Sequence, residues 1–124
     1  MEVLLTDREH ELMEILWDRG SATVAEVREG ITDELARNTV LTFLRRLEDK
    51  GYVRHEEEGR AHRYYATLSR EEATESALSR LTRTVFRGSR ALLLTHLVSD
   101  RDLPEEEARK IRALLDVRLG DEVP

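Results

Sequence analysis

The sequence predicts a mostly α-helical fold that contains one β-hairpin. Three observations predict it: apolar residues recur at helical spacing, capping boxes open three candidate helices, and only residues 52–67 change to a strand-forming composition. The 124 residues, of which 40% are hydrophobic, suffice for one modest core and a smaller additional segment. We therefore expect a compact domain over residues 1–68 and a helical segment over residues 69–124.

The first two helices are each predicted from a capping box and a glycine that ends the helix. In TDRE at 6–9, the Thr and Glu side chains can each bond a backbone N–H at the helix start, and Gly20 supplies the stop. The stretch TVAE at 23–26 repeats this pattern before a helix of barely two turns that Gly30 ends. The inward-facing residues are Leu12, Ile15, Leu16, Val24 and Val27, with Trp17 at the border of the first helix.

A third helix is predicted over residues 38–50, with Gly51 after its end. On a helical wheel at about 100° per residue, its apolar side chains form one stripe and its polar side chains the opposite arc. The arc contains no acid before Asp49, although acids outnumber bases in the chain by 26 to 20. The stripe consists of Val40, Phe43, Leu44 and Leu47, and the arc of Asn38, Thr39, Thr42, Arg45 and Arg46.

A β-hairpin is predicted after the third helix. Residues 52–57 and 61–67 are enriched in Tyr and Val, and Gly59 between them can take the positive φ of a hairpin loop. Three short helices followed by a hairpin is the layout of a winged helix-turn-helix. The second and third helices then form the turn unit, and the hairpin forms the wing.

The segment after residue 68 is predicted to be entirely helical. A third capping box, SREE at 69–72, opens a helix that breaks near Gly88, and further helices follow over 89–99 and 104–120. A helical segment this short buries too little apolar surface to form a stable core by itself. We therefore expect it to pack against a second copy of itself. The residues expected in this homodimer interface are Leu92, Leu93, Leu97, Ile111, Leu114 and Leu115.

The distribution of charge indicates what the polar arc contacts. The net charge of −6 alone argues against a nucleic-acid partner, but residues 35–47 and 59–70 contain no acid and three arginines each. Asn, Thr and Arg are side chains that read base edges in the major groove of DNA, so the polar arc of the third helix is predicted to contact DNA. The simpler alternative is that this arc is a helix face exposed only to solvent. The expected DNA-binding residues are Arg37, Asn38, Thr39, Thr42, Arg45, Arg46, Arg60 and Arg63.

The same residues carry a resemblance to a known family. The first helix contains Glu9, Met13, Leu16 and Trp17, the third reads T-V-x-T-x-L-x-R-L-x-x-K-G, and the second strand contains H-R-Y-Y. Over about residues 4–118 the chain resembles the penicillinase-repressor family, which includes methicillin-resistance and copper-responsive repressors. The resemblance implies a bacterial transcriptional repressor that binds a palindromic operator as a dimer. It implies base-reading roles for Thr39, Thr42 and Arg46, and backbone or flanking-base roles for Arg37, Asn38 and Arg45.

Three features depart from what the resemblance implies. A membrane sensor protease is the upstream partner that the resemblance suggests, and induction in the penicillinase and methicillin branches ends with cleavage of an Asn-Phe bond. The matching place here is Thr95-His96, which argues against that route.

The copper-responsive branch binds metal through paired cysteines, and this chain has 0 cysteines. The acids at 56–58 would repel phosphates, so either Arg60 and Arg63 act from the other strand or, as we favour, the wing tip contributes little.

The remaining patterns predict no catalytic or metal chemistry. No phosphate loop, G-x-S-x-G motif or metalloprotease motif occurs, so we expect no enzyme and no cofactor. His10, His55, His62 and His96 fall in four different elements, and we expect no zinc-type pairing with a carboxylate at helical spacing. His55 and His62 are expected to face each other across the hairpin. No apolar run is long enough to span a membrane and no signal peptide is visible, so a cytoplasmic protein is expected.

Two alternatives stay open at this stage. A winged helix can use its third helix to bind a protein, which the acidic net charge favours. In the second alternative, the protein is a DNA-binding repressor that a small ligand, held between the wing and the dimerisation segment, releases from DNA in place of proteolysis. A lack of salt-dependent binding to DNA would favour the first alternative. A compound that binds the protein and releases it from DNA would favour the second.

Overall fold

The computed structural model describes residues 2–120 and confirms a mostly helical chain with a winged helix. The chain divides into two compact units, one up to Ser79 and one from Arg80 onwards, and this division falls within α4 (Arg70–Thr84). The first unit begins with α1 (Asp7–Arg19), β1 (Ser21–Thr23), α2 (Val24–Gly30), α3 (Arg37–Asp49), β2 (Val53–Glu58) and β3 (Ala61–Ala66).

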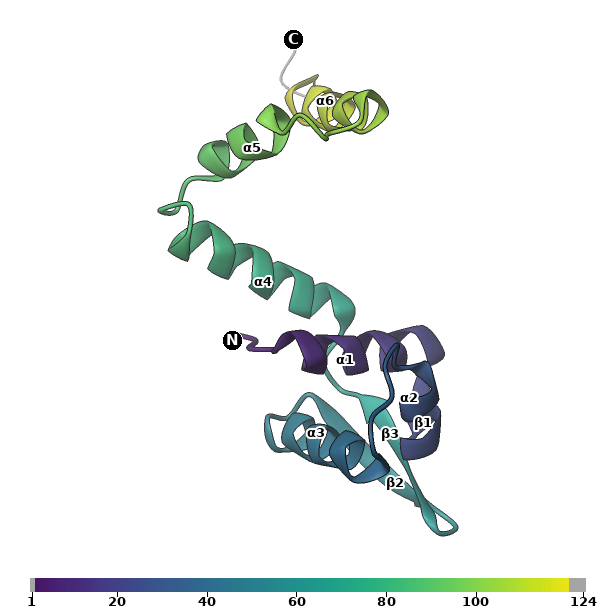
Figure 1. Ribbon diagram of the computed structural model, residues 1–124. Coiled ribbons are helices and arrows are strands. Elements are labelled where there is room, and N and C mark those ends of the chain that lie inside the picture. The colour runs from purple at the N-terminus through teal and green to yellow at the C-terminus, as the bar shows by residue number, and fades with distance from the viewer. Residues whose placement is uncertain (1, 121–124) are drawn as a thin grey trace. The chain divides into compact units, whose positions relative to one another are not determined.

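The sheet of the first unit has three antiparallel strands in the order β1-β3-β2. In the hairpin, His55 lies opposite Tyr64 and Glu57 opposite His62, while Ala22 of β1 pairs with Tyr64 on the other side of β3. Figure 1 shows the three helices gathered against the sheet, with the β2–β3 hairpin extending past them as the wing.

One hydrophobic core holds α1, α2 and α3 against the sheet. Leu12, Met13 and Leu16 of α1 have no exposed surface, and Tyr64 of β3 is buried in the same cluster. Burying side chains of this size stabilises the fold by about 1.5–3 kcal/mol each. The other core residues are Val3, Ala22, Val24, Val27, Ile31, Val40, Leu44, Leu47, Tyr52, Val53, Leu68 and Ala73.

The three predicted capping boxes are confirmed. The Thr6 and Glu9 side chains exchange hydrogen bonds with each other's backbone N–H groups, and Thr23 does the same with Glu26. Ser69 and Glu72 form the equivalent pair at the start of α4. The hairpin turn also forms as expected, because Gly59 adopts a φ of +61° that side chains with a Cβ rarely take.

One element was not predicted. Residues 21–23 form β1, although the sequence interpretation assigned this stretch only to the start of the second helix. Three residues are too few for a strand pattern to be recognised, and the strand exists because the edge of β3 is free to pair with it. The other elements begin and end within about two residues of the predicted bounds, except that α4 ends at Thr84, about four residues before the break predicted near Gly88.

The second unit is built differently. It contains α5 (Arg90–Ser99) and α6 (Glu105–Gly120), and neither helix has a buried residue. Several large apolar side chains are well exposed, from 37% for Leu92 to 72% for Leu114. In the described part of the chain, none of the helices combines the length and apolar character that crossing a bilayer requires.

Candidate nucleic-acid interface

The polar arc of the third helix lies at the surface, as predicted. α3 turns Val40, Leu44 and Leu47 fully into the core, and the 3.6-residue period therefore directs the opposite side chains into solvent. The exposed polar residues on this helix include all six predicted positions, Arg37, Asn38, Thr39, Thr42, Arg45 and Arg46. Phe43 lies at the edge of the apolar stripe and is only half-buried.

The arginines of this face are available for an external partner. Among the described residues, Arg37, Arg45 and Arg46 form no ion pair, and the guanidinium of Arg46 lies 5.7 Å from the centroid of the Phe43 ring. The Thr42 hydroxyl donates to the Asn38 carbonyl at 2.9 Å, so its proton is already used within the helix. The face therefore presents three uncompensated positive charges beside short polar side chains.

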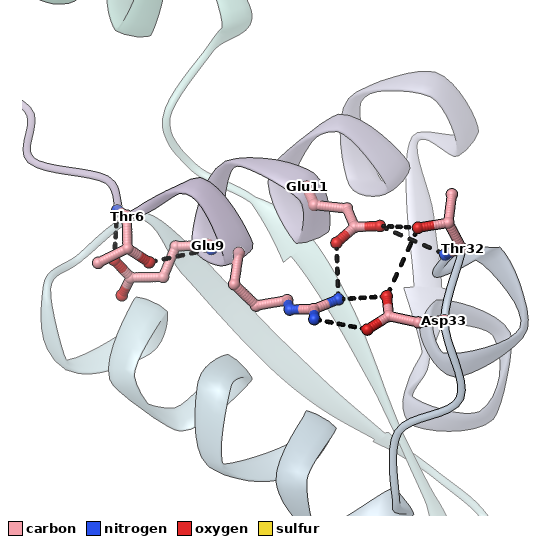
Figure 2. A network of polar contacts seen from close by, with 6 residues as sticks. Thr6, Glu9, Glu11, Thr32 and Asp33 are labelled. Atoms are coloured by element: carbon pink, nitrogen blue, oxygen red, sulfur yellow. Dashed lines mark hydrogen bonds and ion pairs between the residues drawn. The ribbon is translucent and has the colours of Figure 1, made fainter.

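A network of charged side chains ties α1 to the loop that leads into α3 (Figure 2). The guanidinium of Arg8 donates two hydrogen bonds of 2.7 Å to the carboxylate of Asp33 and a third, of 2.9 Å, to Glu11. Glu11 in turn accepts from the backbone N–H and the hydroxyl of Thr32 at 3.3 and 3.2 Å. The loop is thus fastened to α1 four residues before α3 begins.

The electrostatics of this network follow from its geometry. The two hydrogen bonds from Arg8 lower the pKa of Asp33 from its usual 3.8 to about 2. The same contact raises the pKa of Arg8 above its usual value. Both groups are therefore charged throughout the neutral range, and the contact persists as a charge-assisted, bidentate pair.

The other end of α3 is fastened to α1 by a buried carboxylate. Lys50, the C-cap residue, donates to both oxygens of Glu9 at 2.8 and 2.9 Å and to the Leu4 carbonyl at 3.2 Å. Glu9 is only 2% exposed. Burial by itself raises the pKa of Glu9, but the hydrogen bonds from Lys50 and from the Thr6 backbone outweigh it, so the pKa is lowered overall.

The wing neutralises most of its own acids. Arg54 pairs with Glu56 at 2.8 Å, and Arg63 pairs with Glu58 at 2.7 Å and with Glu26 at 3.2 Å. Arg63 is therefore half-buried and held within the fold, whereas Arg60 lies exposed in the turn. Of the two wing arginines predicted to bind DNA, Arg60 is the one presented to solvent without an ion pair in the described structure.

The histidine expectations are met in part. The rings of His55 and His62 stack with centroids 4.6 Å apart, as predicted from the hairpin. The expected lack of carboxylate pairing at helical spacing is wrong, because His10 Nε2 lies 3.3 Å from Glu14 one turn along α1. His55 Nδ1 also lies 2.7 Å from Glu48. In residues 2–120, however, no cluster of three or more potential ligands could hold a metal ion.

The contacts that fasten α3 join residues that no sequence pattern singles out. Arg8 and Asp33 are 25 positions apart and Glu9 and Lys50 are 41 apart. No local pattern links residues at such separations, because each is an ordinary surface charge until the fold brings the pair together.

The profile of the penicillinase repressor family matches residues 5–117 of the chain. The chain belongs to this family. The transcriptional regulator BlaI of Mycobacterium tuberculosis is 34% identical over 120 residues, covering 94% of this chain and 86% of the regulator. As a member of the penicillinase repressor family, the protein is a winged-helix DNA-binding transcriptional repressor and not an enzyme.

Solved structures from the penicillinase repressor family agree with this fold. The solution structure of the DNA-binding domain of the repressor BlaI matches with a TM-score of 0.52 and 29% identity, covering 58% of this chain and 93% of that chain. The monomeric form of Bacillus licheniformis BlaI in complex with the blaP half-operator matches with a TM-score of 0.50 and 28% identity, covering 58% and 90%.

Proposed function

We propose that the protein is a homodimeric repressor that binds a pseudo-palindromic DNA operator with α3 of each copy in the major groove. The observation that carries this proposal is the exposed face of α3, which contains no acid before Asp49 and has three arginines with no ion-pair partner among the described residues. In such a dimer the two recognition helices enter successive major grooves about 34 Å apart.

The side chains of this face suit particular base edges. Arg46 donates two hydrogen bonds to guanine, Asn38 pairs with adenine, and the methyl groups of Thr39 and Thr42 contact a thymine methyl. Arg37 and Arg45 contact phosphates or flanking bases beside them. In the wing, Arg60 contacts a phosphate, and Arg63 contributes chiefly by holding the hairpin to α2 through Glu26.

The relative from Bacillus licheniformis supports this assignment, because its monomeric form is described in complex with a half-operator. One winged helix per half-site is the arrangement that we propose here. Residues 1–68 then supply the DNA-binding domain of each copy, and residues 69–124 join the two copies.

The exposed apolar side chains of the second unit support the dimer. Leu92, Leu97, Leu114 and Leu115 are all at least 37% exposed in the single chain, which a second copy would cover. Leu93 and Ile111 are half-buried and complete the proposed interface. Thr95-His96 stands where cleavage by a membrane sensor protease would be expected, so our proposal does not include that release route.

The test begins with duplexes that the wild-type chain selects from a random-sequence pool. Arg46→Ala is expected to cost about 1–3 kcal/mol of binding free energy and to relax selectivity at one base pair per half-site. Arg60→Ala is the matched control, because it removes the same charge from the wing. It is expected to weaken binding to all sequences alike and to reduce the salt slope by about 1.

Gel-shift titrations of both variants at two salt concentrations provide the measurement. If Arg46→Ala caused the same sequence-independent loss as Arg60→Ala, the assignment of α3 to the major groove would be wrong. Failure of the wild-type chain to enrich any sequence, together with capture of a protein by the α3 face, would favour the protein-interaction alternative instead.

A further inference from the structure

Both ends of the proposed recognition helix are fastened to one short stretch of α1. Arg8 and Glu11 hold the loop before α3 through Asp33 and Thr32, and Glu9 holds the end of α3 through Lys50. Four consecutive positions of α1, residues 8–11, therefore contain all three anchoring side chains. Figure 2 shows Glu11 directed at Thr32, and Glu9 on the Thr6 side of the same helix.

The loop before α3 depends on these side chains for its conformation. In the described structure, residues 32–35 take part in no backbone–backbone hydrogen bond. What holds them, besides the packing of Leu35 against the core, are the Glu11 contacts to Thr32, the bidentate Arg8–Asp33 pair, and the bond of 2.7 Å from Arg28 Nε to the Leu35 carbonyl. The start of α3 has no side-chain cap either, because its N-cap residue is Ala36.

The contacts at the two ends of α3 restrict its rotation and its position along the helix axis more strictly than the apolar core does. Val40, Leu44 and Leu47 anchor α3 by a single apolar stripe, and because apolar contacts are non-directional, the stripe fixes the buried face more strictly than it fixes the rotation and axial position of the helix. Fastening each end to the same rigid helix removes that freedom. Base readout requires side chains held within about 0.5 Å of the productive geometry, so such shifts matter for selectivity.

We propose that Arg8, Glu11 and Asp33 are positioning residues that set the angle and depth at which α3 meets DNA, and thereby the sequence selectivity of the repressor. This inference rests on the proposed function of α3. The residues touch no base, since they act through the loop that carries the start of the helix.

Selectivity and general affinity are expected to respond differently. The exposed arginines of α3 keep their charges when the Arg8–Asp33 pair is broken, so attraction to phosphates persists. Bidentate base contacts, which depend on orientation, are lost. A merely stabilising ion pair would instead lower the melting temperature and leave the ratio of affinities unchanged.

Two variants of opposite charge separate geometry from electrostatics. Arg8→Gln makes the protein more negative by one charge, and Asp33→Asn makes it more positive by one, but both break the same pair. Arg8→Lys keeps the charge and removes the bidentate geometry. Arg70→Gln is the matched control, since Arg70 pairs with Glu14 and Asp18 of α1 at 2.6 and 2.7 Å without holding α3.

The measurement is the ratio of two dissociation constants, one for the duplex that the wild-type chain selects and one for an unrelated duplex of equal length. Arg8→Gln and Asp33→Asn are each expected to lower this selectivity by about 10-fold, the equivalent of one good base contact. Arg8→Lys should give a partial loss, and Arg70→Gln none. Melting curves and circular dichroism identify any variant that fails to fold, in which case Arg8→Lys decides.

The possible failures are distinguishable. If the wild-type chain selects a sequence but the pair-breaking variants keep the wild-type selectivity, the positioning role is overturned and the proposed function stands. If the two variants change affinity in opposite directions on both duplexes, the effect is one of net charge and the positioning role is likewise overturned. If the wild-type chain selects no sequence at all, the proposed function falls and this inference falls with it.

Discussion

The two units of the chain treat their apolar side chains in opposite ways. In the first unit, Leu12, Leu16, Val40, Leu44 and Leu47 have no exposed surface. In α5 and α6 of the second unit, no residue is buried, and Leu114 and Val117 are 72% and 70% exposed. Yet α5 contains a denser run of leucines than any helix of the winged domain.

This difference shows that apolar content does not by itself make a core. The helices of the first unit carry narrow apolar stripes that face one another and a sheet, so a single chain can close around them. The helices of the second unit carry apolar residues around more of their circumference, and few elements are present to cover them. The first unit thus buries its apolar side chains within a single chain, whereas the second unit leaves many of them exposed.

The largest expected effect concerns the closed core. Leu44→Ala removes a fully buried side chain from α3, so it is expected to lower the free energy of unfolding by about 2–5 kcal/mol through lost burial and a cavity. Urea unfolding followed by the fluorescence of Trp17, which packs against this core, measures it. A loss below about 1 kcal/mol would mean that the core is looser than its burial indicates.

The second-largest expected effect concerns the exposed apolar surface of α5 and α6. Leu114→Asp is expected to weaken the proposed dimer by about 30-fold or more, because a charge would be buried against the second copy. Sedimentation equilibrium over a range of protein concentrations gives the dissociation constant. Lys110→Gln is the matched control on the same helix, since it changes the net charge equally at a polar, exposed position. A wild-type chain that sediments as a monomer at every concentration would refute this prediction.

A smaller effect is expected at a helix start in the closed unit. Thr23→Ala removes the hydroxyl that caps α2, a helix of only 7 residues, and should lower the free energy of unfolding by about 1 kcal/mol. Thr23→Ser keeps the capping oxygen and should stay within about 0.5 kcal/mol of wild type. Equal losses in both variants would point to the Thr methyl group rather than to the cap.

The smallest effect depends on pH. The pKa of Asp33 is lowered from 3.8 to about 2 in the folded chain, so its stabilising contribution is complete above about pH 4 and is lost as the pH falls towards 2. Asp33→Asn should therefore be less stable than wild type at pH 6, and the difference should shrink as the pH falls towards 2 and vanish below it. Urea midpoints of both proteins across this range test the sign. A difference that does not shrink with acid would show that the Asp33 side chain acts through something other than its charge.

Much of the fold was predictable because its signals are local. The capping boxes at Thr6, Thr23 and Ser69 were each recognisable from residues three apart, and each forms. The exposed arc of α3 followed from the same short-range reasoning, since a helix with one buried stripe must turn its other side chains outward. The assignment of that arc to DNA stays a prediction.

The features that escaped prediction depend on contacts between distant residues. The strand β1 forms because β3 offers it a hydrogen-bonding edge at least 40 positions away. Arg63 was expected to face DNA, but the fold places it between Glu26 and Glu58, where it is engaged within the domain. Trp17 was correctly assigned to the edge of the core, yet its N–H bond of 2.8 Å to the Leu68 carbonyl could not have been foreseen.

The sequence by itself determined which segments are helical, where they start, and which face of α3 is polar, because periodicity and capping act within a few residues. Only the tertiary structure decided how that face is held. The Arg8–Asp33 and Glu9–Lys50 contacts exist because folding brings charges from distant parts of the chain within 3 Å of one another. Such pairings have no signature in the order of residues, since a charge on a helix surface can meet any partner that the packing of the core places beside it.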